Sequence, residues 1–155
     1  MAPLDEEDFM ILRALQREGR ISYAELSRRT GIPDSTVHDK IERLVARGVI
    51  RKFAAILNGE KVGVDTAAII GLETGAKLYH AVAKALCEVE EVVEVYGTTA
   101  EFDLMIKIRT STRDELSRLL NRIRRIDGVD DIYVSSILET FKEEPTLPLR
   151  EPLKS

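Results

Sequence analysis

Fourteen residues near the start of the chain, GIPDSTVHDKIERL at positions 31–44, gather side chains that can hydrogen-bond and carry charge. A glycine and a proline open this stretch, and an amphipathic helix follows. Its outward side chains are small and polar at one end and basic at the other. They are Ser35, Thr36, His38, Asp39, Lys40 and Arg43. Such groups can donate hydrogen bonds to phosphate oxygens or meet the edges of bases, so their chemistry suits contact with nucleic acid.

Charge is distributed unevenly along the chain. Of the 155 residues, 44% are apolar and 32% are charged, which is typical of one or two small globular domains. The net charge of -4 argues against a uniformly basic nucleic-acid binder. Residues 20–52, however, hold eight basic and four acidic side chains. This local excess indicates a nucleic-acid partner for one part of the chain only.

Three short helices are expected in the first third of the chain. The first begins after Asp5, a good N-cap, and ends near Gly19. The second begins with Ser22 and Glu25, which can form a capping box, and ends at Gly31. The apolar side chains expected to share a core are Phe9, Ile11, Leu12, Leu15, Leu26, Val37, Ile41 and Leu44.

A very short turn at Gly31 separates the second helix from the third, which is the arrangement of a helix-turn-helix. Ser27 is small at the point where two crossing helices leave little room, and Val37 fills the space between them. The third helix begins near Pro33–Asp34 and stops at Gly48. A generic three-helix bundle is the alternative interpretation of these residues.

The run VIRKFAAIL, residues 49–57, is rich in β-branched and apolar side chains and predicts a strand, either a wing or a linker. An Asn58–Gly59 turn signal follows it. We therefore place a domain boundary near residue 60. Residues 1–60 form a winged helix-turn-helix domain with its linking strand, and residues 61–155 form a second domain with the C-terminal tail.

The second domain has the element order β-α-β-β-α-β. Strands are expected at residues 67–74, 91–97, 103–110 and 130–141, and helices at 76–88 and from 111–112 to about 126. This order predicts a ferredoxin-like α+β domain, with both helices on one face of an antiparallel sheet. The other face carries Ile69, Val93, Met105 or their neighbours. A second subunit is expected to cover it in a sheet-to-sheet homodimer.

Cysteine use and hydropathy favour a cytoplasmic protein without membrane contact. Cys87 is the single cysteine, so no disulfide framework is possible within one chain. No apolar run approaches the ~20 residues that cross a bilayer. The acidic N-terminus, MAPLDEEDFM, is unlike a signal peptide.

Several segments follow one another in a specific order and spacing. They are ELSRRTGI, STVHDKIERL and GVI in the first part, then EVVEVYGTTAEFDLMIKI, GVDDIYVSSIL and the tail FKEEPTLPL. Over about residues 4–149 the chain thereby resembles the Lrp/AsnC family of transcriptional regulators, also called feast/famine regulators. Two positions depart from the family pattern. Ala100 stands where a glycine is common, and Pro33–Asp34 stands where Ser-Pro is common.

The resemblance implies a sequence-specific DNA-binding transcriptional regulator. Its winged helix-turn-helix domains form a dimer on a βαββαβ core, and such dimers often assemble into octamers. Small molecules, commonly amino acids, bind between the core domains and alter assembly or DNA affinity. Two-fold dimers predict a pseudo-palindromic operator in double-stranded DNA. No cofactor, metal ion or enzymatic activity is expected.

A recognition helix lays its N-terminal part in the major groove. There the short Ser35 and Thr36 can donate to phosphate or touch a base edge. His38, Asp39 and Lys40 are expected to face outward at the depth of the base edges. Lys40 can read guanine, while Asp39 can accept from cytosine or orient Lys40. The candidate phosphate contacts are Tyr23, Arg28, Arg29, Arg43, Arg51 and Lys52.

By resemblance, the loop YGTTAEFD, residues 96–103, lines the effector cleft, with the Ser135–Ser136 strand nearby. An amino acid needs donors for its carboxylate and acceptors for its ammonium group, and this loop offers both. The candidate effector-binding residues are Thr98, Thr99, Ala100, Glu101, Asp103, Ser135 and Ser136. The alternative is a plain β-hairpin in which Asp103 caps its own turn.

Two other classes of protein are weighed against a DNA-binding regulator. Haem-biosynthesis decarboxylases resemble this family and use basic and histidine side chains, for which His80 with Lys77 or Lys84 would be candidates. The motifs of serine hydrolases, zinc proteases and P-loop enzymes are absent from the sequence. A ligand-sensing assembly module that no longer binds DNA is the other alternative.

Overall fold

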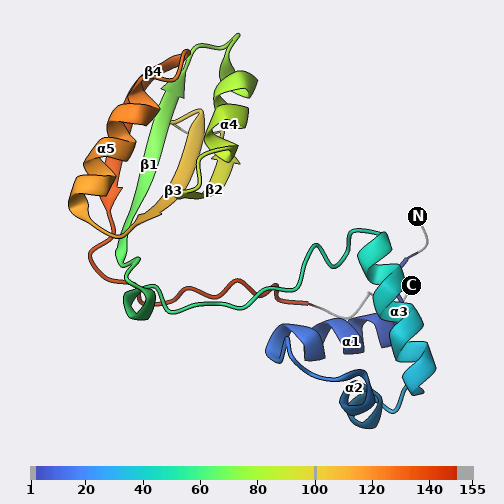
Figure 1. Cartoon of the computed structure of the whole chain (residues 1–155). Helices are drawn as coiled ribbons and strands as arrows, with labels where there is room; N and C mark the ends of the chain where they lie inside the picture. Colours follow the sequence, from blue (N-terminus) through green and yellow to red (C-terminus); the bar gives the residue numbers. More distant parts are fainter. Residues whose placement is uncertain (1–2, 100, 150–155) are drawn as a thin grey trace. The chain divides into compact units, whose positions relative to one another are not determined.

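The computed structural model describes residues 3–99 and 101–149, which fall into two compact units (Figure 1). One unit contains the chain up to Ile56 together with the segment that starts at Glu143, and the other contains Leu57–Lys142. The C-terminal segment, assigned from sequence to the second domain, therefore packs with the first. Ala100, a candidate effector residue, lies outside the described residues. Within the described ranges, no helix has the length and apolar character needed to span a bilayer.

Three helices build the first unit: α1 (Glu6–Arg17), α2 (Tyr23–Thr30) and α3 (Asp34–Ala46). Asp5 caps α1 and forms a reciprocal capping box with Asp8. Ser22 caps α2 by accepting a hydrogen bond from the Glu25 amide at 3.2 Å, whereas the Glu25 side chain turns elsewhere. Gly31 ends α2 with φ of 75°, a conformation that glycine adopts without steric cost.

The core of this unit is apolar and lies between the three helices. Ile11, Leu26, Val37 and Leu44 have no solvent exposure, as the helical spacing of apolar residues predicts. Val37, on α3, shares this core with Leu26 of α2, close to the turn at Gly31. The helix-turn-helix interpretation is therefore confirmed, and the buried face of α3 packs against α1 and α2.

The segment predicted as a strand is not one. Residues 51–58 form neither helix nor strand, and they end in a short 3-10 helix, η1 (Glu60–Val62). Phe53, Ile56 and Leu57 are largely exposed. A β-branched run becomes a strand only where a neighbour satisfies its amide and carbonyl groups, and within the described part of this chain the run has no such neighbour.

The second unit contains β1 (Thr66–Thr74), α4 (Tyr79–Cys87), β2 (Val92–Gly97), β3 (Leu104–Thr110), α5 (Arg113–Arg124) and β4 (Val129–Ser136). The strand order is β2-β3-β1-β4, and each neighbouring pair is antiparallel. This confirms the predicted βαββαβ arrangement. Thr112 caps α5 by accepting from the Glu115 amide at 3.1 Å.

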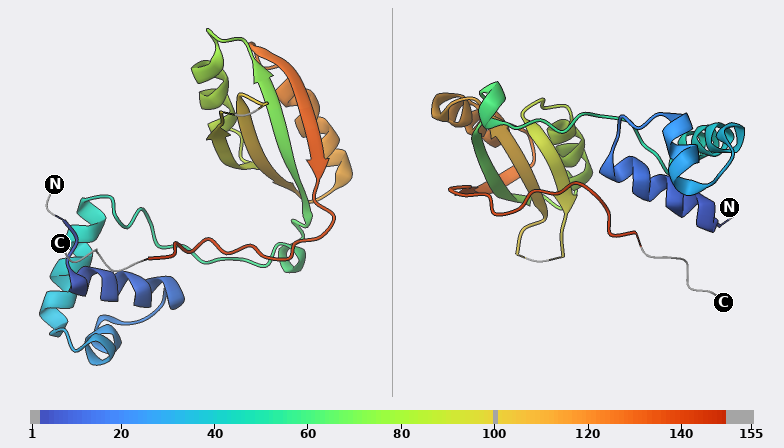
Figure 2. Two further views of the ribbon diagram at one scale, coloured as in Figure 1. Left: turned by 180° about the vertical axis from the view of Figure 1, so that it is seen from behind. Right: turned by 90° about the horizontal axis from the view of Figure 1, so that it is seen from below.

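Both helices of this unit cover the same face of the sheet, and the view from behind looks onto the other face (Figure 2). The covered face carries Ile70, Ile106 and Ile108, which pack in one core with side chains of α4 and α5. The alternate residues of each strand form the opposite surface, which we call the open face. Its exposed or half-buried side chains include Ile69, Tyr96, Met105 and Tyr133.

Candidate nucleic-acid interface and ligand site

The N-terminus of α3 is built to face a polar partner. Pro33 occupies the N-cap position, so no side chain caps the first backbone amides of the helix. The turn before it is fixed, because the Thr30 hydroxyl donates to the Leu26 carbonyl at 2.7 Å and the Gly31 amide donates to the Ser27 carbonyl at 2.8 Å. Free amides at a helix N-terminus attract phosphate.

Four of the predicted DNA-contacting side chains lie on the outer surface of α3. Ser35, His38 and Asp39 are exposed, and Thr36 is half-buried. The His38 ring meets the edge of the Tyr23 ring from the start of α2, with ring centroids 5.3 Å apart. The structure therefore joins two candidate contacts from different helices into one surface.

His38 also lies beside acidic side chains of its own helix. Its ring nitrogens are 3.9 Å from Asp39 Oδ1 and 3.7 Å from Glu42 Oε1. One potential ligand atom from each of the three residues lies within 4.8 Å of the others. All three side chains are exposed, and exposed acidic groups often gather in this way without a metal ion.

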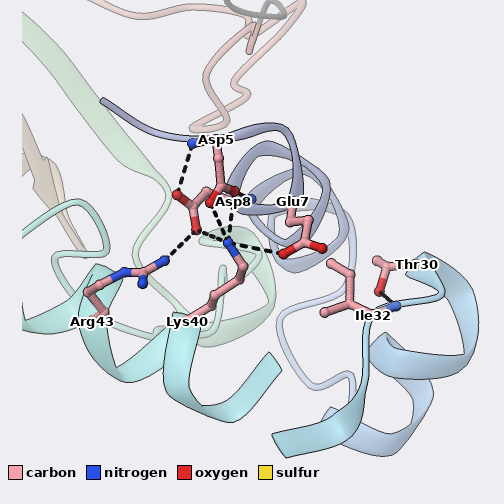
Figure 3. Close-up of polar contacts among 7 residues, drawn as sticks. All are labelled: Asp5, Glu7, Asp8, Thr30, Ile32, Lys40 and Arg43. Carbon is pink, nitrogen blue, oxygen red and sulfur yellow. Dashed lines mark hydrogen bonds and ion pairs between the residues drawn. The ribbon is translucent and has the colours of Figure 1, made fainter. Parts of the chain in front are cut away.

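Lys40 was predicted to face outward toward base edges, and the structure shows that it does not. Its side chain is only 7% exposed, and its ammonium group reaches back to the start of α1 (Figure 3). Lys40 Nζ lies 2.6 Å from Asp5 Oδ2, 3.2 Å from Glu7 Oε2 and 3.1 Å from Asp8 Oδ1. A side chain held in this way cannot read guanine, so Asp39 has no outward lysine to orient.

These contacts favour the charged forms of Lys40 and Asp5. Burial opposes the charge of Lys40, but hydrogen bonds with Asp5, Asp8 and Glu7 outweigh it and raise the pKa of the ammonium group. The hydrogen bond from Lys40 lowers the pKa of Asp5. Lys40 is therefore an anchor that fixes α3 against α1.

Arg43 lies at one side of this cluster and is partly exposed. One of its terminal nitrogens lies 3.3 Å from Asp8 Oδ1, on the buried carboxylate that Lys40 also holds. The rest of the side chain is accessible, with 51% exposure. An arginine tethered at one nitrogen keeps other donors free, and its remaining freedom of movement is reduced.

Arg28 and Arg29 are neither simple solvated residues nor free phosphate contacts. The Glu25 carboxylate accepts from Arg28 and from Arg29 at 2.6 Å each, and Arg29 also pairs with Glu18 at 2.8 Å. The hydrogen bonds from Arg28 and then Arg29 lower the pKa of Glu25 to about 2. Arg51 and Lys52 are exposed on the connecting segment.

The predicted effector loop is held by hydrogen bonds to β1. Asp103 Oδ2 accepts from the Thr74 amide at 2.8 Å, and the Asp103 amide donates to the Leu72 carbonyl at 3.0 Å. The Thr98 hydroxyl donates to the Phe102 carbonyl. Asp103 therefore joins its loop to the end of β1 instead of capping its own turn, while Thr99 and Glu101 remain exposed.

Phe102, which sequence reasoning did not single out, folds from this loop onto the open face. Its ring centroid lies 5.0 Å from that of Tyr133, and it covers Gly71, where a Cβ atom would lie 2.5 Å from the ring. A hydrogen bond to Glu73 raises the pKa of the Tyr133 hydroxyl, and the charges of Asp131 and Glu101 add to the effect. The result is an aromatic pair beside several carboxylates.

The two serines of β4 lie on different faces. Ser135 pairs with Ile69, and Tyr133 pairs with Gly71, so Ser135 shares the open face with the aromatic pair. Ser136 pairs with Ala68 and belongs to the face that the helices cover. The structure thus places Ser135, but not Ser136, on the side where Phe102 lies.

Three functional residues were missed from the sequence. No role was assigned from the sequence to Glu7, Asp8 or Gln16. A signal for the Lys40 anchor does exist, because Lys40 lies three residues after Val37 and four before Leu44, on the buried stripe of α3. The partners of Lys40 lie more than 30 residues away and leave no local pattern.

Comparisons with known proteins agree with this geometry. A winged helix-turn-helix DNA-binding model matches residues 4–51, and an Lrp/AsnC ligand binding domain model matches residues 67–147. Over 147 residues the chain is 41% identical to the HTH-type transcriptional regulator FL11 of Pyrococcus abyssi, covering 95% of this chain and 97% of that protein. Relatives named in this way favour a regulator over a decarboxylase.

Solved structures show the same architecture. The complex of transcriptional regulator NMB0573 from Neisseria meningitidis with L-Met superposes with a TM-score of 0.86 at 27% identity, covering 94% of this chain and 97% of that one. AsnC of E. coli gives 0.81 at 28% identity, with 97% and 100% covered. The chain belongs to the Lrp/AsnC family and is a DNA-binding transcriptional regulator with a ligand-binding domain.

Proposed function

We propose that this regulator binds pseudo-palindromic DNA as a homodimer, with the N-terminal half of α3 in the major groove. The uncapped start of α3, with Ser35, His38 and Asp39 exposed beside it, is the observation that carries this proposal. Ser35 and Thr36 contact phosphate or base edges, and His38 and Asp39 read bases. Lys40 holds the helix in position from behind.

A second set of residues supplies affinity without sequence preference. Arg43 contacts phosphate from its tethered position, and Tyr23 supports His38 at the same surface. Arg51 and Lys52 add positive charge on the connecting segment. Arg28 and Arg29 contribute when a phosphate replaces the Glu25 carboxylate, because both ligands are oxyanions that suit a guanidinium group.

The open face is the proposed dimer interface. Ile69, Tyr96, Met105 and Tyr133 give it an apolar and aromatic character, and helices cover only the other face. Apolar surface of this kind favours burial against a second copy. Two copies then present two recognition helices, which suits two half-sites spaced by whole turns of about 10 bp.

The proposed effector is an amino acid with an apolar side chain, bound at the Phe102–Tyr133 pair. Glu73 and Glu101 supply negative charge for its ammonium group, and the exposed Thr99 and Ser135 supply donors. The aromatic rings offer a surface for its side chain. That a structural relative was solved with L-Met supports this chemical class.

The first experiment measures binding to the DNA upstream of the protein's own gene, at two salt concentrations, with and without each amino acid. We expect tight, salt-sensitive and sequence-dependent binding that at least one apolar amino acid changes. Sequence-indifferent binding would overturn the operator proposal, and thermal shifts unresponsive to every amino acid would overturn the effector proposal.

A further inference from the structure

The C-terminal segment links the two units a second time. After β4, the Ile137 amide donates to the Ala67 carbonyl at 2.9 Å. Residues 137–149 form no helix or strand and are drawn as an extended chain (Figure 2). From Glu143 on, the chain packs with the helix-turn-helix unit. We call residues 143–149 the strap.

One side chain of α1 holds the strap by its backbone. The Gln16 carboxamide accepts from the Leu147 amide at 2.7 Å and donates to the Leu147 carbonyl at 3.1 Å. A primary amide matches a peptide group in this way, because each offers one donor and one acceptor side by side. The contact recognises an extended backbone and does not depend on the Leu147 side chain, which is largely exposed.

Apolar contact and stiffness support this clamp. Leu149 packs against the apolar core of the three helices. Pro145 and Pro148 flank the clamp, and proline restricts the backbone, so less conformational entropy is lost when the strap docks. A cavity of about 270 Å³ lies between α1 and residues 146–149. The strap therefore rests on a few discrete contacts, which single substitutions can remove.

We propose that the strap restrains the helix-turn-helix unit by docking on α1, and so gives the ligand-binding domain a second line of attachment to it. If one irregular segment alone joined the helix-turn-helix unit to the ligand-binding domain, that unit would sample many orientations. The docked strap, as a second attachment, reduces their number. Docking is intramolecular, so modest contacts suffice. The strap continues directly from β4, which carries Tyr133 and Ser135, so events at that strand reach the DNA-binding unit through it.

A matched pair of substitutions at one exposed position tests the clamp in the full chain. Leu147→Pro removes the amide that donates to Gln16, while Leu147→Ala keeps it. Gln16→Ala removes the clamp from the other side, and Asn121→Ala on α5 controls for loss of an exposed helical amide. The readout is amide hydrogen exchange of residues 143–149, followed by mass spectrometry without any ligand.

We expect exchange of this segment to be at least about fivefold faster in Leu147→Pro and Gln16→Ala than in the wild type, Leu147→Ala and Asn121→Ala. Wild-type exchange at the rate of an unstructured peptide would overturn docking. Equal rates in the proline and alanine variants would overturn the backbone clamp.

The role in DNA binding rests on the proposed function and has its own readout. With the DNA upstream of the gene, we expect Leu147→Pro and Gln16→Ala to weaken binding at least about threefold, and the two controls to leave it unchanged. Faster exchange with unchanged affinity would overturn the restraining role. Absence of wild-type binding would instead count against the operator proposal, and the exchange measurement would still decide whether the strap docks.

Discussion

The Lys40 ammonium group and the Asp5 carboxylate are 2.6 Å apart, although 35 residues separate them in sequence. Asp5 is the N-cap of α1, and Lys40 lies in the middle of the recognition helix. The same carboxylate thus caps the start of one helix and fixes the position of another. This contact therefore joins the position of α3 to the start of α1.

Lys40→Met is expected to lower the free energy of unfolding by about 3 kcal/mol, because it leaves the buried Asp8 carboxylate with Arg43 as its remaining cationic partner. Urea titration measures this loss. Lys52→Met, at an exposed lysine of the connecting segment, is the control and is expected to change it by less than about 0.5 kcal/mol.

The same variant, Lys40→Met, also tests whether Lys40 anchors α3 or reads bases. With Lys40→Met, any loss of DNA binding is expected to be similar across a library of sites, because the whole helix shifts. A loss confined to one base position, with unfolding unchanged, would contradict the anchoring role and restore base reading.

Glu25→Gln is expected to tighten DNA binding, because it removes the carboxylate that engages Arg28 and Arg29. The slope of log K against log salt should steepen by about 1 as a further cation reaches phosphate. Titrations at several salt concentrations measure the slope. Glu90→Gln, which removes an exposed carboxylate from the other unit, is the control, and an equal effect in both variants would show that net charge alone is responsible.

Acid should remove the stabilisation that Glu25 provides. Its pKa falls from 4.5 to about 2 on folding, so the contribution is complete above pH 4.5 and is lost as pH falls through about 2. The difference in unfolding free energy between wild type and Glu25→Gln should therefore shrink across this window. Urea titrations at about pH 7 and about pH 2 measure it, and a constant difference would contradict the assigned ion pairs.

Gly71→Ala should displace Phe102 from the open face, since the new Cβ atom would lie 2.5 Å from the ring. We expect a loss of about 1–3 kcal/mol in unfolding free energy, measured by urea titration, and a smaller thermal shift with any responsive amino acid. Gly75→Ala is the matched control, because nothing lies within 4 Å of its added Cβ atom. Equal behaviour of the two variants would contradict a role for Phe102.

Local sequence rules predicted much of the fold. Caps at Asp5, Ser22 and Thr112 and the left-handed Gly31 lie where the residue types indicate, because each depends on neighbours within four residues. The strand at residues 67–74 was likewise predicted, and β1 begins one residue earlier, at Thr66. These features depend on backbone geometry that the sequence determines nearby.

Contacts between distant segments were not predictable in the same way. Residues 49–57 have strand propensity, but propensity does not supply a pairing partner. Lys40 was assigned outward by its charge, although its position on the buried stripe indicated otherwise, and the acids that compensate it lie in another helix. Which face of the sheet Ser135 and Ser136 each occupy depends on the register between β4 and β1. Only the folded sheet defines that register.

The buried lysine has a consequence for how such a regulator acquires new target genes. The charge of Lys40 is neutralised inside the protein by acids of α1. The exposed residues Ser35, His38 and Asp39 can therefore change without disturbing the packing between α3 and α1. Operator preference can then drift by surface substitutions alone. An engineer who wants a new operator can therefore randomise these three positions and leave α1 and the acids at its start untouched.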